Sequence, residues 1–222
     1  MASGTGPCEA VVFDFGGVVF NWKPIDLILS LWPHLAKTRD EAQALAQSIF
    51  QSFVPGSDWA EFDRGRVEEA ALVQRLAQRT GLADSDLHQL VAAIPGHLAP
   101  MAATVDWIER LARAGTRLHF LSNMPRPYAE HLVREHAFLK HFRSGVFSCE
   151  VGQIKPEAAI FETAARQFGL APAACVFIDD HAGNVAAARQ WGWRAVQFAD
   201  AAQCERELLE LGALPGPAAQ QA

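Results

Sequence analysis

Asp14 stands where an apolar run, Val11 to Phe13, gives way to two glycines, Gly16 and Gly17. Buried strands favour β-branched and aromatic residues, and glycine lets the backbone bend tightly around whatever the carboxylate holds. A carboxylate at such a strand end can act as a nucleophile. The ordinary alternative is a turn aspartate that bonds its own backbone.

Two later segments place further polar groups beside expected strand ends or helix starts. Ser122 and Asn123 follow a strand expected over 117–121, where they can cap a helix or donate hydrogen bonds to an anionic oxygen. Lys155 precedes a helix expected over 156–168, which has a proline at its favoured first position. The helix dipole disfavours a cation at that position, and a nearby anion would resolve the conflict. We therefore expect Lys155 to neutralise both an attacking carboxylate and a bound phosphate.

Asp179 and Asp180 follow an apolar strand expected over 175–178. Two adjacent carboxylates at a buried strand end are costly without a cation. Mg²⁺ takes oxygen ligands and is typically held by one or two carboxylates together with phosphate oxygens. The sequence therefore predicts one polar site that binds Mg²⁺ and an anionic substrate.

From about residue 98 onward, short apolar strands alternate with amphipathic helices, which is typical of βαβ units and of a parallel sheet. We expect strands over 117–121, 145–148, 175–178 and 194–198, and helices over 101–112, 128–140, 156–168, 184–191 and 201–211. The predicted fold class is α/β with a parallel-sheet core.

The stretch from 20 to 97 shows helical patterns without a convincing buried strand between them. Two sets of apolar residues each share a helical face: Leu27, Ile28, Leu31 and Leu35 in one, and Val67, Ala71, Leu72 and Leu76 in the other. We expect an α/β core over 8–19 and 98–211, a helical cap insert over 20–97 and a flexible tail over 212–222. Open α/β sheets bind ligands beyond the carboxyl ends of their strands, where such a cap can close over the site.

Four segments resemble, in their order and placement, the motifs of the haloacid-dehalogenase-like (HAD) hydrolases. They are Phe13-Asp14-Phe15-Gly16-Gly17-Val18, Leu121-Ser122-Asn123, Lys155-Pro156 and Ile178-Asp179-Asp180-His181-Ala182-Gly183-Asn184-Val185. The resemblance runs from about Val11 to Phe198 and implies a Rossmann-like core with an inserted helical-bundle cap. Within that superfamily the chain is most similar to the subgroup with a helical cap after the first motif, which includes α-D-glucose-1-phosphate phosphatase-like proteins.

The resemblance implies catalytic roles for Asp14, Ser122 and Lys155, and a substrate-binding role for Ser122, Asn123 and Lys155. Asp14 would be the nucleophile that forms an aspartyl-phosphate, and Ser122, Asn123 and Lys155 would hold the phosphoryl group. A covalent intermediate divides one difficult displacement into two easier ones.

The resemblance also implies the Mg²⁺ ligands. Asp180 would be the principal ligand of the fourth motif, and Asp179 would support it directly or through water. Asp14 and the backbone carbonyl of Gly16 would complete the protein's share of the ligands, and the ion would reduce repulsion between Asp14 and an anionic substrate.

The chain departs from the family pattern at Gly16. Most phosphatases of the superfamily carry a second aspartate there, which protonates the leaving alcohol and then activates water, although the α-D-glucose-1-phosphate phosphatase-like subgroup tolerates glycine. General acid–base catalysis is typically worth about 10²–10⁴-fold, so another group must supply it or it is lost. Candidate replacements are His181, His34 and Asp63, each of which has a solvated or structural role as its ordinary interpretation.

The sequence therefore favours a Mg²⁺-dependent phosphatase of a small phosphorylated metabolite, such as a sugar phosphate. One alternative is a 2-haloacid dehalogenase, which resembles this chain in lacking the second aspartate and uses the same nucleophile without metal. Such enzymes typically need a cap arginine for the halide; Arg39 is the first arginine after Asp14, and the paired carboxylates argue against this activity. The other alternative is a non-catalytic phosphometabolite-binding protein, in which Gly16 has abolished turnover.

The selective contacts with a substrate are expected from the insert, where Trp59, Phe62, Arg64 and Arg66 lie close together in the sequence. Their ordinary interpretation is a helix–turn–helix junction with solvated charges. In a closing cap, Trp59 or Phe62 could stack on a sugar, and an arginine could reach a second anionic group.

Composition narrows the class of partners. The 222 residues carry a formal charge of −6, which argues against a broad nucleic-acid footprint. The four cysteines show no C-x-x-C spacing and are expected to be reduced, buried thiols. The chain shows neither a basic leader nor a run of about 18 apolar residues, so we expect a cytoplasmic protein without membrane contact. The sequence leaves the oligomeric state open.

Overall fold

The computed structural model describes residues 8–214, and these contain a parallel sheet of five strands in the order β3-β2-β1-β4-β5. The strands are β1 (Ala10–Phe13), β2 (Arg117–Ser122), β3 (Ser144–Phe147), β4 (Cys175–Asp179) and β5 (Arg194–Gln197). Each neighbouring pair runs parallel, which confirms the predicted α/β fold class. Because β1 lies between β2 and β4, Asp14 follows the strand at which the chain order reverses, where open α/β sheets bind their ligands.

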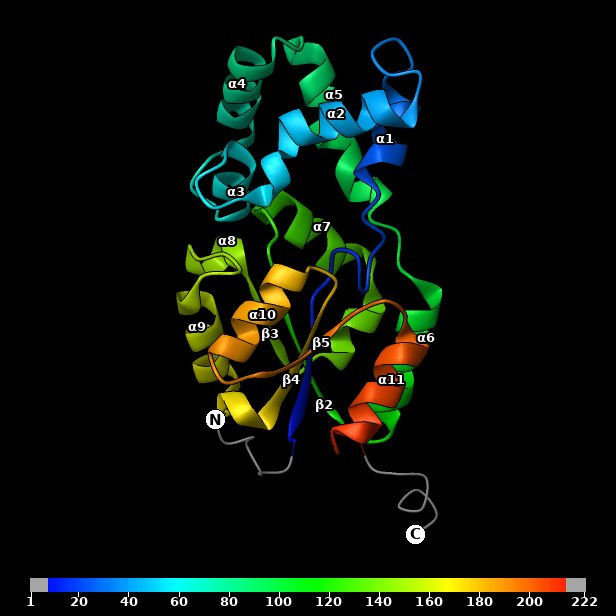
Figure 1. Ribbon diagram of the computed structural model, residues 1–222, viewed down its shortest axis with the longest axis vertical. Helices are drawn as coiled ribbons and strands as arrows, with labels where there is room; N and C mark the ends of the chain where they lie inside the picture. Colours follow the sequence, from blue (N-terminus) through cyan, green and yellow to red (C-terminus); the bar gives the residue numbers. More distant parts are fainter. Residues whose placement is uncertain (1–7, 215–222) are drawn as a thin grey trace.

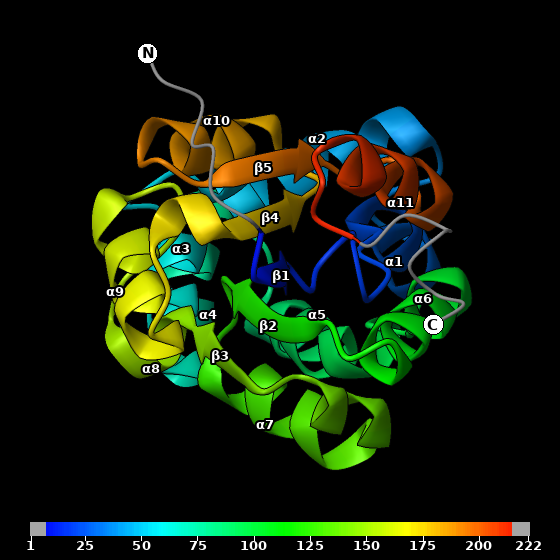
Figure 2. The same ribbon diagram turned by 90° about the horizontal axis from the view of Figure 1, so that it is seen from below.

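Helices cover both faces of the sheet (Figure 2). One face carries α6 (Ala102–Arg113), α7 (Arg126–Glu135) and α11 (Ala201–Glu210), and the other carries α9 (Ala158–Phe168) and α10 (Ala182–Gln190). Successive side chains of a strand point to opposite faces, so β1 buries all four of its residues. Phe13 packs in the cluster that contains Trp107 of α6, whereas Val12 packs in the cluster that contains Phe161 of α9.

Five helices follow β1 before the chain returns to the sheet. They are α1 (Pro24–Leu31), α2 (Arg39–Phe50), α3 (Asp58–Asp63), α4 (Glu69–Thr80) and α5 (Asp84–His97), and a short 3₁₀ helix, η1 (Gln51–Phe53), follows α2. Figure 1 shows the five helices gathered at one end of the molecule, beyond the carboxyl ends of the strands. We keep the division into a core over 8–19 and 98–211 and a cap over 20–97 as a proposal, and refer to α1 to α5 with their connections as the cap.

The start of α9 differs from the sequence prediction. The helix begins at Ala158 rather than at Pro156, because Glu157 is extended and its N–H donates to the Ile154 carbonyl in a turn, at 3.0 Å. Lys155 therefore lies in this turn and not at a helix N-terminus. The helix-dipole argument for Lys155 is wrong, and its charge must be explained by its contacts instead.

Two other boundaries also differ. The helix expected over 128–140 divides into α7 and η2 (Ala137–His141), because the backbone of His136 is extended between them. The strand expected over 145–148 ends one residue early, and Ser148 begins the short helix α8 (Ser148–Val151).

Each of the two helical faces predicted in the cap includes one residue that lies outside the observed helix. Leu27 and Ile28 are buried in α1, but the helix ends at Leu31, so Leu35 lies beyond it and is exposed. Val67 is buried but precedes α4, which begins at Glu69.

Three remaining sequence predictions concern the thiols, the chain end and membranes. All four cysteines are free; three are buried, and Cys8 is half-buried. Of the tail predicted over 212–222, residues 215–222 lie outside the described part of the chain. Within residues 8–214, no helix is both long and apolar enough to cross a bilayer.

Candidate active site

The loop after β1 holds Asp14 against β4. The Asp14 N–H donates to the Ile178 carbonyl at 2.9 Å, and its side-chain Oδ1 accepts from the Phe15 N–H at 2.6 Å. Gly17 has φ +73°, and a Cβ on it would lie 2.3 Å from Oδ2 of Asp180. Glycine is therefore favoured at position 17, because the loop passes directly against the carboxylate that follows β4.

Lys155 joins the ends of β1 and β4 through two ion pairs. Its Nζ lies 2.9 Å from Oδ1 of Asp14 and 2.7 Å from Oδ2 of Asp179. The lysine is 2% exposed, and Nζ also lies 5.3 Å from the centre of the Phe177 ring. Burial alone would lower the pKa of Lys155, but the two carboxylates outweigh it and raise that pKa, so the amine stays charged.

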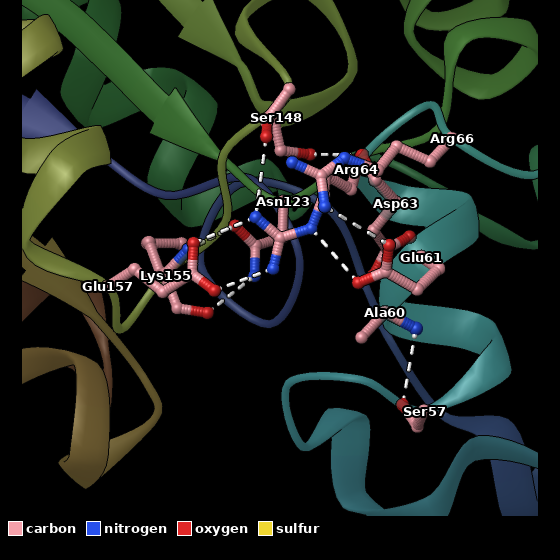
Figure 3. A network of polar contacts seen from close by, with 11 residues as sticks. Ser57, Ala60, Glu61, Asp63, Arg64, Arg66, Asn123, Ser148, Lys155 and Glu157 are labelled. Atoms are coloured by element: carbon pink, nitrogen blue, oxygen red, sulfur yellow. Dashed lines mark hydrogen bonds and ion pairs between the residues drawn. The ribbon is translucent and has the colours of Figure 1, made fainter.

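Asn123 binds the backbone of Lys155 (Figure 3). Its Oδ1 accepts from the Lys155 N–H at 2.8 Å, and its Nδ2 donates to the Lys155 carbonyl at 3.1 Å. Its amide was predicted to hold the phosphoryl group, whereas both ends of that amide are engaged in fixing the turn that carries Lys155. The side chain therefore positions the lysine, and because Nδ2 has a second N–H, its predicted contact with the phosphoryl group stays a prediction.

Ser122, the last residue of β2, is 1% exposed. Among the described residues, no partner lies within hydrogen-bond distance of its hydroxyl. It does not cap α7, whose N-cap is Pro125. A buried hydroxyl without a partner is unfavourable, and a ligand oxygen at this strand end would relieve the cost.

Three carboxylates, Asp14, Asp179 and Asp180, offer ligand oxygens that lie within 4.8 Å of one another. Asp179 is fully buried and accepts from the His181 N–H and from the Asn184 amide, as well as from the lysine. Burial raises the pKa of Asp14 to about 7, with Asp179 and Asp180 acting in the same direction and the lysine opposing them. Burial and the charge of Asp179 also raise the pKa of Asp180.

These carboxylates fit a hard divalent cation. One lysine does not balance three acids, as the raised pKa values of Asp14 and Asp180 indicate, and the available donors are all oxygens, the ligands that Mg²⁺ prefers. Gly16 lines the same cavity as Asp14 and Asp180, and the part of its carbonyl as a further ligand stays a prediction. A Cβ on Gly16 would meet no atom within 4 Å, so the position occupied by the family's second aspartate is open space.

A cavity of about 310 Å³ connects this polar cluster with the cap. Asp14, Lys155 and Asp180 belong to its polar end. The rest of its wall is largely apolar and includes Trp22, Phe53, Trp59, Leu98 and Tyr128. Sequence reasoning singled out Trp59 but missed the others, since nothing in the pattern around them distinguishes a cavity wall from a core.

The cap is fastened to the core through Arg64, which the sequence suggested was solvated. Arg64 is 6% exposed, and its Nε lies 3.0 Å from Glu61. Its two terminal nitrogens donate to Glu157 at 2.8 and 2.6 Å, ahead of α9 (Figure 3). The solvated interpretation holds for Arg66, whose side chain is 63% exposed, but is wrong for Arg64 because its neighbours Gly65 and Asp63 pack against α8.

The three candidate proton donors lie in different places. Asp63, on α3, is 5% exposed and lines the cavity, and His181 lines it as well. His34 is not among the lining residues; its ring is 57% exposed and lies 3.8 Å from Asp86. The structure therefore brings Asp63 and His181 to the site and leaves His34 outside it.

A family model described as haloacid dehalogenase-like hydrolase matches residues 8–192. Among curated proteins, the sesquiterpene phosphatase astK of Aspergillus oryzae is 26% identical over 205 residues, covering 91% of this chain and 96% of that protein.

Two solved structures share the fold. A HAD family enzyme from Bacteroides thetaiotaomicron, in complex with magnesium and inorganic phosphate, superposes with a TM-score of 0.66 at 19% identity, covering 89% of this chain and 98% of that one. The L-2-haloacid dehalogenase from Xanthobacter autotrophicus superposes with a TM-score of 0.65 at 19% identity, covering 94% of this chain and 85% of that one. At such identities the likeness concerns the fold and not the activity.

Proposed function

This chain belongs to the haloacid dehalogenase-like hydrolases, and from that membership we propose that it is a Mg²⁺-dependent phosphatase of a small phosphorylated organic molecule, acting through an aspartyl-phosphate on Asp14. One observation carries the proposal: a buried lysine joins the nucleophile to a cluster of three carboxylates at the carboxyl end of the sheet. The relative named as a sesquiterpene phosphatase supports the same activity, whereas the comparisons give the α-D-glucose-1-phosphate phosphatase subgroup no specific support.

Each side chain has a defined task in this mechanism. Asp14 attacks phosphorus, and the charge of Lys155 stabilises the carboxylate form of Asp14 against its burial. The same charge offsets the negative charge on the phosphoryl oxygens in the transition state. The buried hydroxyl of Ser122 donates to one of these oxygens, and Asn123 keeps the Lys155 turn in place.

Asp14, Asp179, Asp180 and the carbonyl of Gly16 are the groups that would hold Mg²⁺. When bound, the ion supplies positive charge that reduces repulsion between the nucleophile and the anionic ester. Asp179 already accepts from Lys155 and Asn184, so Asp180, which keeps solvent contact, has the freer oxygens of the two.

A dehalogenase receives less support from the structure. Among the described residues that line the cavity there is no arginine to receive a halide ion. Arg39 is paired with Asp26 at 2.7 Å, with 68% of its side chain exposed. The carboxylate cluster has no use in a metal-free displacement of halide.

The proposal is tested by phosphate release from a panel of phosphate monoesters, with Mg²⁺ or with EDTA. Asp14→Asn should abolish release, because an amide is a far poorer nucleophile than a carboxylate, while Asp106→Asn on the exposed side of α6 should leave it unchanged. Release that persists in Asp14→Asn would refute the covalent mechanism. If the protein binds Mg²⁺ and phosphate without turning over any ester, it is a binding protein; halide release from 2-haloacids would instead identify the dehalogenase.

A further inference from the structure

The cavity has two chemically different ends. The polar end holds the carboxylates and Lys155, and the opposite end lies beneath the cap. Trp22 and Phe53 are half-buried there and expose apolar surface to the cavity, and Leu98 continues the same wall. An apolar wall that remains partly open beside a reactive centre is expected to contact the non-reacting part of a substrate.

The backbone that presents Phe53 is strained. Gln51, Ser52 and Phe53 have φ values of 48°, 52° and 54°, a left-handed conformation that is unfavourable for residues other than glycine. The Phe53 ring stacks on Phe50 with centroids 5.4 Å apart and lies 6.2 Å from Trp22. Three consecutive strained residues persist only where packing fixes them, and such strain is concentrated at ligand sites.

The cap end offers few partners for polar groups. Asp63 lies toward the polar end, where its carboxyl interacts with the charges of Lys155 and Asp14. Among the other described residues that line the cap end, the side chains with a hydrogen-bonding group are Ser52, Tyr128 and, through their indole N–H, Trp22 and Trp59. The hydroxyl of Tyr128 already donates to the Val91 carbonyl at 2.9 Å. A sugar placed here would leave several hydroxyls without partners, and each would cost free energy of binding.

From these observations we propose that the substrate is a phosphate monoester of an apolar alcohol, whose hydrocarbon or aromatic part occupies the cap end of the cavity. The proposal rests on the proposed phosphatase function and specifies its substrate class. A volume of about 310 Å³ is near the lower end of ligand sites, which span about 300–1,000 Å³, so the alcohol is of modest size. Transfer of its apolar surface from water supplies the selectivity.

The test compares 2-phenylethyl phosphate with glucose 6-phosphate, since both are esters of primary alcohols and differ in the group that enters the cap end. We expect kcat/KM to be at least about tenfold higher for 2-phenylethyl phosphate. Phe53→Asn should remove most of that preference, because asparagine tolerates the left-handed backbone but not the apolar contact. Val133→Asn is the matched control, since Val133 is 58% exposed on α7 and does not line the cavity.

Binding of both esters to Asp14→Asn, measured by calorimetry, separates the substrate class from the activity. If glucose 6-phosphate is hydrolysed as well as 2-phenylethyl phosphate or better, the substrate class is wrong while the phosphatase stands. If neither ester is hydrolysed but 2-phenylethyl phosphate binds more tightly, the apolar binding site is supported and the phosphatase activity is refuted. Equal binding, or a preference that survives Phe53→Asn, overturns the inference.

The carboxylate of Asp63 supports a second inference, which is independent of the substrate class. Its carboxylate lines the cavity, is 5% exposed, and has no hydrogen-bond partner among the described residues. Its backbone carbonyl accepts from the Ser148 hydroxyl at 2.5 Å, and the neighbouring Arg64 holds Glu157, so the end of α3 is fixed on the core (Figure 3). An unpaired buried carboxyl facing a reactive centre is costly, so a function is expected of it.

The geometry points to Asp63 as the general acid that replaces the aspartate missing at position 16. As Asp14 attacks phosphorus and the bond from phosphorus to the alcohol oxygen breaks, the Asp63 proton passes to that oxygen and releases a neutral alcohol. The resulting carboxylate then takes a proton from the water that attacks the aspartyl-phosphate, which yields inorganic phosphate and restores the acid. Burial raises the pKa of Asp63 well above its usual range, with Lys155 opposing and Asp14 assisting, so the proton is available for transfer.

The test uses leaving groups with different needs for a proton. Asp63→Asn should lower kcat for 2-phenylethyl phosphate by about 10²–10⁴-fold but lower it far less for p-nitrophenyl phosphate, whose phenolate leaves unprotonated. Gly16→Asp, placed in open space, should restore part of the loss. Asp58→Asn is the control in the same helix, outside the cavity. Equal losses for both esters, without rescue by Gly16→Asp, would identify Asp63 as a structural residue and overturn the inference.

Discussion

Asp14 should make the metal-free protein less stable as the pH rises. Its pKa is raised from 3.8 to about 7 in the folded state, so the folded protein holds this proton more tightly than the unfolded chain does. The stabilisation from that proton is fully present below the unfolded pKa and is lost as the pH rises through the folded pKa. At about 1.4 kcal/mol for each pH unit, the free energy of unfolding should lose about 4 kcal/mol between pH 4 and pH 8 from this group alone. Asp14→Asn carries no such proton and should lack the loss.

Urea unfolding in EDTA, at several pH values between 4 and 8, measures this effect as the difference between Asp14→Asn and wild type. Other titrating groups contribute equally to both proteins and cancel in this difference. The free energy of unfolding of the variant, relative to that of wild type, should therefore rise with pH, and most steeply between pH 5 and 7. Asp106→Asn should track the wild type at every pH, because its side chain is exposed. A difference that stays constant within about 1 kcal/mol across the range would refute the electrostatic reasoning. Added Mg²⁺ should stabilise wild type at pH 8 more than Asp14→Asn, because it binds the folded carboxylates.

Three further substitutions test the contacts that build the site. Lys155→Met should lower the free energy of unfolding by about 3–5 kcal/mol and abolish turnover, because it leaves buried carboxylates without their cation. Gly17→Ala should cost about 1–3 kcal/mol and weaken Mg²⁺ binding measured by calorimetry, since the new methyl group would collide with the Asp180 carboxylate. Arg64→Met should cost about 1.5–3 kcal/mol in urea unfolding and speed proteolysis of the cap, whereas Arg66→Met should change stability by no more than about 0.5 kcal/mol.

Each comparison has a control on the same chain. Lys140→Met places the same side chain at an exposed position, and a similar loss there would show that the Lys155 effect is not electrostatic. Gly115→Ala meets a left-handed φ of +78° with no atom within 4 Å, so it isolates backbone strain from collision. If Gly115→Ala lowers the free energy of unfolding and the Mg²⁺ affinity as much as Gly17→Ala does, the contact with Asp180 is not the cause of the losses in Gly17→Ala.

The sequence alone determined the α/β fold class, because a parallel sheet buried on both faces requires short apolar strands between amphipathic helices. It also indicated candidate reactive groups, because the carboxylates, the lysine and the serine each stand beside an expected strand end or helix start, and the carboxyl ends of parallel strands meet at one edge of a sheet. It did not determine where every helix begins, as the extended backbone of Glu157 ahead of α9 demonstrates. Local sequence could not reveal that turn, since its conformation depends on Asn123 binding the Lys155 backbone from 32 residues away.

Tertiary structure alone decided how the cap meets the core. In the sequence, Arg64 and Asp63 have the pattern of surface charges, but the packing of α3 on α8 buries both. Arg64 then links the cap to Glu157 of the core, and Asp63 lines the cavity. The apolar wall formed by Trp22, Phe53 and Leu98 was equally invisible, because those residues lie far apart in the chain and no periodicity links them. Sequence specifies which chemistry is present through residue type, whereas burial and proximity, which set charge states and substrate contacts, arise only when distant segments pack together.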